Sequence, residues 1–371
     1  MINTASEKRL SSVLESMRFP LIFLVVIAHM VPFDSPRVTL SWHAQDIYTL
    51  ISEMISHNLA RLSVRCYFLI SGYYVFKKMI QWEGFYTSQL KKKISTLLIP
   101  YLFWNVLLVI AVVLKHHLFL RMGWGPDEGY PFISTASLYT LLWGGPANFP
   151  LWYLRDLLCM ILLIPFFYYW FHFTKVYGLL LFMGCYLGLI ESHIPGFSTT
   201  AFTFFGAGAY LAMFNKDLLA LCQRFCLPSL IMAVILLGLA TAFNGTAHHE
   251  YIVRLFILVG VVGIINVFDL LQHNPRVQSM LRMLAPSSFF IYVVHEIYII
   301  NWLKGAWAKL TAGSSAWLQV AGYFLVPCLC LIVCLGLFRL VKRTSPGLLG
   351  LLTGGRINPY VFKAPNTLEK K

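Results

Sequence analysis

Arg18 and His29 are the first residues in the chain whose types and spacing could support chemistry. They stand eleven positions apart in an apolar stretch. At about 100° per residue, His29 returns to within about 20° of Arg18, so both lie on one helix face. The rise of about 1.5 Å per residue places them roughly 16 Å apart along the axis. This face presents a fixed cation and a titratable base, unless Arg18 is an interfacial snorkelling residue and His29 a satisfied core histidine.

Arg61 and Arg65 form a second candidate cluster. Positions i and i+4 are neighbours on one face of a helix, and two cations there repel unless an anion or a carboxylate lies between them. Such a pair could hold a polar or anionic substrate. The structural alternative is an ion pair with Glu53 or Asp46, which stand just upstream.

Arg155 and Asp156 form a third cluster at the start of an apolar run. They follow Trp152 and Tyr153, two aromatic residues that suit the interfacial belt of a membrane protein. Adjacent residues on a helix point in different directions, so this spacing alone does not make Arg155 and Asp156 a pair.

His295 and Glu296 form the last cluster, in the apolar stretch that begins at Ser288. A charge inside a membrane span costs at least about 2.5–3.5 kcal/mol on insertion scales, so a sequence keeps it for a purpose inside the bundle. We expect His295 at a depth comparable to that of His29. A second buried histidine with a carboxylate beside it argues against purely structural roles.

The elements that must position these residues are membrane helices. Apolar residues make up 58% of the chain and charged residues 12%, about half of the charged share of a soluble domain. A transmembrane helix needs about 20 largely apolar residues. The sequence therefore predicts an all-α, polytopic integral membrane protein with about ten transmembrane helices. The expected runs are 17–33, 57–76, 94–114, 151–172, 176–191, 199–214, 228–243, 253–271, 286–303 and 317–340.

The distribution of Lys and Arg gives the expected orientation. Twenty of these residues fall in one set of alternating segments and six in the other. Because positive loops stay inside, both termini are predicted to be cytoplasmic, which requires an even number of spans. We expect a cytoplasmic segment 1–16, a transmembrane domain 17–340 and a cytoplasmic tail 341–371. The first run reads as an uncleaved helix, since no signal-peptidase-like site follows it.

The same observations argue against several other classes of protein. The net charge of +14 is explained by topology, with a secondary attraction to anionic lipid heads, so we expect no nucleic-acid partner. The eight cysteines lack the spacing of a disulfide framework or a zinc site, and we expect no bound metal. The chain contains no P-loop, nucleophile elbow or H-E-x-x-H motif.

With these residues in place, the sequence resembles the acyltransferase-3 family of bacterial membrane O-acyltransferases over most of its length. Arg18 and His29 match the family's R-x10-H signature in the first helix. Arg65 is a departure, because members often have Pro there. The other stretches that look like family patterns are 61–72 (RLSVRCYFLISG), 91–104 (KKKISTLLIPYLFW), 151–156 (LWYLRD) and 288–295 (SFFIYVVH). We expect a stand-alone membrane domain with no extracellular SGNH-type domain.

The resemblance implies transfer of an acyl group, usually acetyl, from cytosolic acyl-CoA to a hydroxyl of an envelope glycan or lipid-linked sugar. No cofactor is expected to be bound, since acyl-CoA is a co-substrate. His29 would act as general base or form an acyl-histidine, with Arg18 as its catalytic partner. The three arginines Arg61, Arg65 and Arg155 could hold the acceptor or the developing oxyanion. The full set of expected substrate-binding residues is Arg61, Arg65, Arg155, His295 and Glu296. The expected site for the phosphates of acyl-CoA comprises Arg18, Lys91, Lys92 and Lys93.

Two other functions use the same residues without acyl chemistry. The first is a transporter or flippase for an anionic lipid-linked sugar or polysaccharide, and the second is a non-catalytic membrane sensor or scaffold. In all three cases the expected location is the bacterial inner membrane. The sequence does not specify the acyl group, the acceptor or the oligomeric state.

Overall fold

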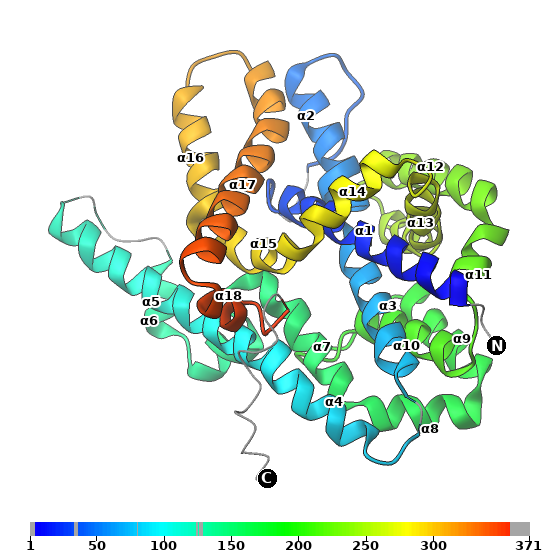
Figure 1. The fold of residues 1–371 in the computed structure, drawn as a ribbon. Helices are drawn as coiled ribbons and strands as arrows, with labels where there is room; N and C mark the ends of the chain where they lie inside the picture. Colours follow the sequence, from blue (N-terminus) through cyan, green and yellow to red (C-terminus); the bar gives the residue numbers. More distant parts are fainter. Residues whose placement is uncertain (1–3, 33–35, 80, 124, 126–128, 357–371) are drawn as a thin grey trace, which may run out of the picture.

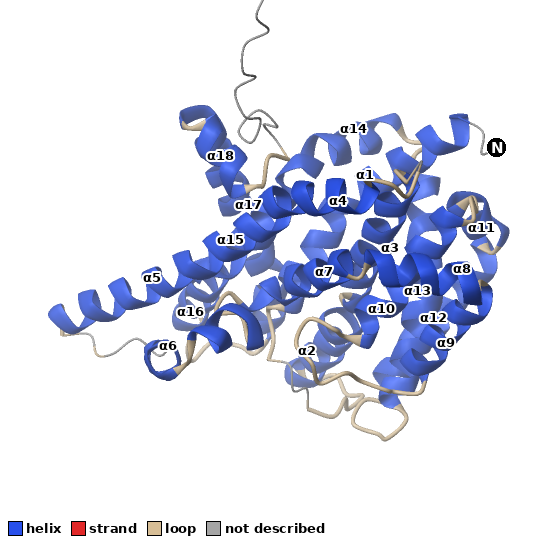
Figure 2. Cartoon of the chain, turned by 90° about the horizontal axis from the view of Figure 1, so that it is seen from below, coloured by secondary structure: helices blue, strands red, loops and turns tan. Residues whose placement is uncertain are grey.

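The computed structural model describes residues 4–32, 36–79, 81–123, 125 and 129–356. All regular secondary structure in these residues is helical, which confirms the all-α prediction (Figures 1 and 2). The helices pack around an apolar core, while many large apolar side chains on the outer helices are exposed, as expected for a surface that faces lipid.

The helices follow one another along the chain with short connections. The α-helices are α1 (Thr4–Ala28), α2 (Ala44–Ser52), α3 (Arg61–Lys77), α4 (Phe85–Lys93), α5 (Ile99–Arg121), α6 (Tyr130–Thr135), α7 (Trp152–Leu162), α8 (Ile164–Thr174), α9 (Val176–Leu187), α10 (Thr199–Met213), α11 (Leu218–Arg224), α12 (Cys226–Ala242), α13 (His249–Leu271), α14 (Pro275–Leu284), α15 (Ser288–Val294), α16 (Ile300–Leu310), α17 (Trp317–Thr344) and α18 (Pro346–Leu352). The π-helical turns are η1 (Glu53–Leu59), η2 (Ile94–Leu98), η3 (Thr140–Gly144) and η6 (His295–Ile299), and the 3-10 turns are η4 (Phe149–Leu151) and η5 (Ala285–Ser287).

Fewer of these helices qualify as complete membrane spans than the sequence predicts. In the described part of the chain, five helices are long and apolar enough to cross a membrane, or seven if each of two bent pairs is one span. Each predicted run contains a helix, but α9 has 12 residues and α10 has 15, shorter than the 20 or so that a full span needs. The number of ten spans stays a prediction.

Several predicted boundaries are wrong by more than a turn. The first helix begins at Thr4 and ends at Ala28, whereas the expected run was 17–33. The fourth run breaks between α7 and α8, which are bent by 61° at Leu163, next to the proline in the first turn of α8. The ninth run is interrupted by η6, directly at the predicted site residues.

The arrangement of the helices agrees with the two sets of alternating segments. Figure 2 shows the N-terminal end of α1, together with α14 and α18, on one side of the molecule, and α2 on the opposite side. The first side contains segments that the charge pattern places together. Which of the two sides faces the cytoplasm stays a prediction.

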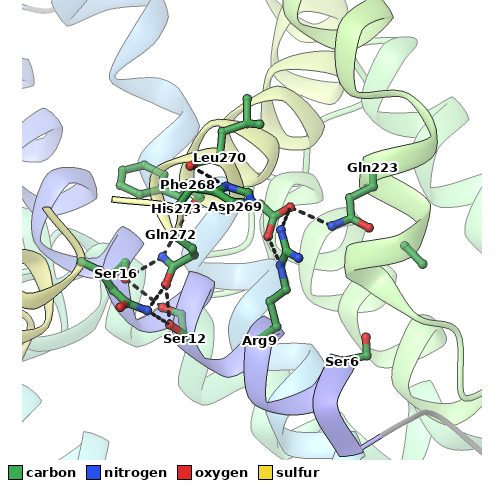
Figure 3. A network of polar contacts seen from close by, with 12 residues as sticks. Ser6, Arg9, Ser12, Ser16, Gln223, Phe268, Asp269, Leu270, Gln272 and His273 are labelled. Atoms are coloured by element: carbon green, nitrogen blue, oxygen red, sulfur yellow. Dashed lines mark hydrogen bonds and ion pairs between the residues drawn. The ribbon is translucent and has the colours of Figure 1, made fainter. Parts of the chain in front are cut away.

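Polar contacts at its N-terminal end hold α1 against α13 and α14 (Figure 3). Arg9 forms two hydrogen bonds with Asp269, at 2.6 and 2.9 Å, and Gln223 donates to the same carboxylate at 2.7 Å. Ser12 donates to Gln272 at 2.5 Å. These contacts fix the register of the helix that carries Arg18 and leads to His29.

The close packing of α3 on α10 positions the opposite wall of the bundle. A β-carbon on Gly72 would lie 2.1 Å from the Phe205 carbonyl oxygen, and one on Gly208 would lie 2.1 Å from the Leu69 carbonyl oxygen. Only glycine allows the two backbones to approach this closely, as is common between membrane helices.

Candidate functional site

The structure brings His29, His295 and Glu296 together. His29 Nδ1 lies 3.4 Å from Glu296 Oε2, and the rings of His29 and His295 have centroids 5.2 Å apart. The two histidines come from opposite ends of the sequence and meet inside the bundle. The two rings are neighbours, so the two histidines necessarily lie at comparable depths in the bundle.

His29 occupies the turn that ends α1, and three elements hold it there. Its backbone N–H donates to the Val26 carbonyl at 3.2 Å, and Lys304 Nζ of α16 donates to the His29 carbonyl at 2.9 Å. The Phe149 ring of η4 meets the imidazole edge-on at 6.3 Å. Lys304 was not predicted as a site residue, because nothing in its local sequence links it to a position 275 residues earlier.

The backbone is irregular where it presents His295 and Glu296. In η6, Ile297 has a ψ of 79° and Tyr298 has a φ of 62°, outside the helical region. A non-glycine residue with positive φ costs about 1–3 kcal/mol and tends to occur at functional sites. The widened turn of a π-bulge has the same association. This irregularity marks the segment as a candidate site independently of residue type.

The hydrogen bonds of His295 define its tautomer. Nδ1 lies 3.0 Å from the carbonyl oxygens of both Ile291 and Tyr292, and because carbonyls only accept, Nδ1 carries the proton. Nε2 therefore has a lone pair. It is buried and has no hydrogen-bond partner within the described ranges. This nitrogen can accept a hydrogen bond from a substrate hydroxyl.

The same cluster has the composition of a metal site. One ligand atom from each of His29, His295 and Glu296 lies within 4.8 Å of the others. Two histidines and a glutamate are a known zinc ligand set. The sequence led us to expect no metal, so a chelator belongs in any test of this site.

Arg18 lies at the other end of the face that leads to His29. Tyr67 Oη donates to the Arg18 carbonyl at 2.7 Å, and the Arg18 side chain is exposed. Among the described residues, no carboxylate lies within 4 Å of its guanidinium. The charges that act on Lys93 of α4 are also cationic and come from Arg356, Lys92 and Lys78.

Arg356 is a neighbour of Arg18 that the sequence analysis did not identify. It follows α18 and has Arg18 and Tyr153 among its electrostatic neighbours. Packing around the guanidinium, together with the nearby Arg18, lowers the pKa of Arg356 to about 10, so it remains a cation at neutral pH. In the sequence, Arg356 is distinguished only by its positive charge within the predicted cytoplasmic tail 341–371.

Three tyrosines connect the cations to the histidine cluster. The Tyr67 and Tyr153 rings lie 6.0 Å apart, and the Tyr153 and Tyr292 rings lie 6.1 Å apart. Tyr292 stands one turn before Glu296. The Tyr153 ring also packs against the Phe68 ring, with centroids 4.7 Å apart, while its place in an interfacial belt stays a prediction.

The structure pairs Arg61 with a carboxylate that the sequence did not suggest. Arg61 Nη1 lies 2.8 Å from Glu250 of α13, and Arg65 donates to the Arg61 carbonyl at 3.2 Å. Glu53 lies 3.2 Å from His249, and Asp46 accepts from a serine. The repulsion between the two arginines is therefore relieved by α13.

Arg155 and Asp156 do form a pair. Arg155 donates from Nε to Asp156 at 3.0 Å, and from Nη1 to the carbonyls of Trp143 and Gly144 at 2.8 and 3.0 Å. A polar cavity of about 230 Å³ adjoins them. Its other polar lining includes Ser192, His193 and Ser198.

The predicted residues thus separate into distinct groups. His29, His295 and Glu296 form one cluster, whereas Arg18 and Lys93 belong with Arg356. Lys91 and Lys92 are exposed on α4. The roles assigned to Arg61, Arg65 and Arg155 stay predictions, and each of these arginines is engaged within the protein.

Comparison with known proteins identifies the family to which the chain is similar. The family model described as an acyltransferase domain matches residues 12–339. The chain is 25% identical over 360 residues to the succinoglycan biosynthesis protein ExoH of Rhizobium meliloti (strain 1021), with 94% of each protein covered. No solved structure matches the chain. The matched range includes the histidine cluster and Arg18 but ends before Arg356.

Proposed function

Because the chain belongs to the acyltransferase family, we propose that it is a membrane O-acyltransferase, which moves an acyl group, taken to be acetyl, from acyl-CoA to a glycan hydroxyl. The observation that carries the proposal is the contact of 3.4 Å between His29 and Glu296 in a protein of this family. A carboxylate that holds one ring nitrogen of a histidine leaves the other to act as general base.

The proposed reaction assigns each proton to a named atom. In this proposal His29 carries a proton on Nδ1, the nitrogen that lies 3.4 Å from Glu296 Oε2. Nε2 takes the proton of the acceptor hydroxyl as its oxygen attacks the thioester carbonyl. The C–S bond breaks, and the CoA thiolate takes that proton from the imidazolium. Glu296 stabilises the transient imidazolium charge. His295 Nε2 accepts a hydrogen bond from the acceptor and orients it.

The distance between Arg18 and His29 supports a long acyl donor. Arg18 on α1 and His29 in the turn that ends this helix lie about 16 Å apart along its axis. Acyl-CoA carries its phosphates at one end and its thioester at the end of a long neutral arm, so it can occupy both ends at once. An acyl phosphate has the two groups adjacent and cannot. The tyrosines between them offer an amphipathic wall for such an arm.

The acceptor is proposed from chemistry and from similarity. ExoH is a protein of succinoglycan biosynthesis by its name, so we propose an envelope glycan or a lipid-linked sugar as acceptor. The polar cavity beside Arg155 and Asp156 has the donors and acceptors that a sugar needs. The expected location is the bacterial inner membrane.

The test is acyl transfer by the purified full chain in detergent, with radiolabelled acetyl-CoA and an envelope glycan extract. His29→Ala should lower the rate by about 10²–10⁴-fold, the range for loss of a general base. His172→Ala is the matched control, because this histidine is exposed on α8. Its rate should equal that of the wild type.

Two outcomes would contradict the proposal. Equal transfer by wild type and His29→Ala would eliminate His29 as the base. A wild-type protein that neither binds nor turns over CoA would favour the flippase alternative. A third arm of the assay adds EDTA, because the cluster has the composition of a metal site. If EDTA abolishes the activity and zinc restores it, His29 is a metal ligand and not a general base.

A further inference from the structure

The segment after α17 folds back onto the bundle. Trp104 Nε1 of α5 donates to the Leu352 carbonyl at the end of α18, at 3.0 Å. Figure 1 shows α18 beside α5, in agreement with this contact. Residues that the sequence assigns to a tail are therefore part of the folded domain up to Arg356.

A glycine makes this docking possible. Gly354 has a φ of +64°, and a β-carbon on it would lie 2.7–2.9 Å from backbone atoms of Thr96 in η2. Both the conformation and the close approach require glycine. The turn consequently places Arg356 next to the end of α4, where Lys93 stands.

The Arg356 side chain is held in a way that leaves donors available. Its guanidinium lies 3.7 Å from the centroid of the Phe289 ring, and Nη1 donates to the Thr353 carbonyl at 2.7 Å. A guanidinium has five N–H groups, and stacking on a ring leaves its edge open. The guanidinium is packed on one side, but the residue as a whole is exposed to solvent, so a ligand can reach its open edge.

The electrostatic surroundings of Arg356 favour an anion. The positive charge of Arg18 repels that of Arg356. Lys93 is repelled by three cations, which are Arg356, Lys92 and Lys78. In the part of the chain that the structure describes, no carboxylate within 4 Å neutralises Arg18, Lys93 or Arg356. Arg356, on the turn after α18, thus repels both Arg18 of α1 and Lys93 of α4, and a phosphorylated ligand would relieve that repulsion.

We propose that Arg356 and the turn that carries it complete, with Lys93 and Arg18, the binding site for the phosphate groups of the acyl donor. This inference rests on the proposed function. Arg356 binds phosphate with its free edge while Phe289 supports the guanidinium plane. The donor specificity thus depends on a residue outside the range that matches the family.

The experiment compares two donors that differ in phosphate. The full chain in detergent is assayed with acetyl-CoA and with acetyl-pantetheine, which has the same thioester and arm but no phosphate. Arg356→Ala should lower kcat/KM for acetyl-CoA by about tenfold or more, because a charge-assisted hydrogen bond is lost. Its kcat/KM for acetyl-pantetheine should match that of the wild type, which also reports an intact fold.

Further variants separate the charge from the stacking and from the general positive potential. Arg343→Ala removes an exposed cation from the last turn of α17 and should leave both donors unaffected. Phe289→Leu should weaken acetyl-CoA use less than Arg356→Ala does. Arg18→Ala should also lose the preference for acetyl-CoA.

The outcomes distinguish this inference from the proposed function. If the wild type uses neither donor, the proposed function fails. If the wild type is active and Arg18→Ala loses the preference while Arg356→Ala keeps it, only the role of Arg356 is wrong. Equal losses with both donors would reduce Arg356 to a structural residue. Loss of co-purified anionic phospholipid from Arg356→Ala with unchanged donor preference would assign the cations to a lipid headgroup instead.

Discussion

Two regions of this protein contain clusters of cations, and they differ in burial and in the partners that the protein supplies. On α3, α7 and α13, basic side chains lie against carboxylates of the protein itself. These pairs are Arg61–Glu250, Arg155–Asp156 and Arg254–Glu191. Around Arg18, Lys93 and Arg356, no such carboxylate lies within 4 Å in the described ranges.

The difference separates cations that stabilise the fold from cations that await a ligand. A charge inside a bundle is costly unless it is paired, and removal of one partner leaves the other uncompensated. Where the protein supplies the partner, the charge belongs to the architecture. Where it does not, the cations are at least partly open to solvent, and they are available to a substrate or a lipid phosphate.

Glu296→Gln tests an expected exception. The His29–Glu296 pair is supplied by the protein itself, yet we propose that it serves chemistry and not the stability of the fold. Glutamine keeps the size but loses the charge that stabilises an imidazolium. We expect kcat to fall by about 10²-fold or more with little change in thermal stability. The measurement is the transfer rate with acetyl-CoA beside the melting temperature in detergent.

The matched control is Glu7→Gln. Glu7 lies 2.9 Å from Lys77 in an exposed ion pair. Such pairs contribute about 0–1 kcal/mol, so this variant should keep both its rate and its melting temperature. A Glu296→Gln protein that melts early and retains its rate would place this pair with the structural ones.

Asp156→Leu tests the structural side of the comparison. Asp156 is 1% exposed and Arg155 is 9% exposed, so loss of the carboxylate leaves a buried, unpaired guanidinium. We expect a loss of about 3–5 kcal/mol in the free energy of unfolding. The double variant Arg155→Met/Asp156→Leu should recover part of it, because it removes both charges.

Denaturant unfolding followed by tryptophan fluorescence measures both variants. A single variant that is as stable as the wild type but has a raised KM for the acceptor would return Arg155 to the role the sequence suggested, in the polar cavity beside it.

The fold class was predictable because apolar run length is a property of the sequence alone. The breaks were harder, because they depend on packing. The proline at the start of α8 marks the bend after Leu162, but no residue type announces the bulge that gives Tyr298 its positive φ. The early start of α1 reflects polar contacts such as Arg9–Asp269, which join positions 260 residues apart.

The site was predictable in its residue types and only partly in its groupings. His29, His295 and Glu296 stood out as ionisable groups in apolar runs, and they meet. Arg61 and Arg155 stood out equally, yet they are neutralised by partners, one of them distant in sequence. Arg356 could not be found, because its position depends on a turn that docks through Gly354.

Lys91→Ala tests whether the lysines that the sequence assigns to the acyl-CoA site differ from one another. The sequence groups Lys91 with Lys92 and Lys93. Of these two neighbouring lysines, Lys92 is among the charges that lower the pKa of Lys93, and Lys91 is not. Lys91 is exposed, where solvent and salt screen its potential. We expect KM for acetyl-CoA to change by less than about twofold, whereas Lys93→Ala should raise it by about tenfold. If the two variants give equal effects, the donor reads a diffuse positive surface, and the distinction between paired and unpaired cations carries no information about where it binds.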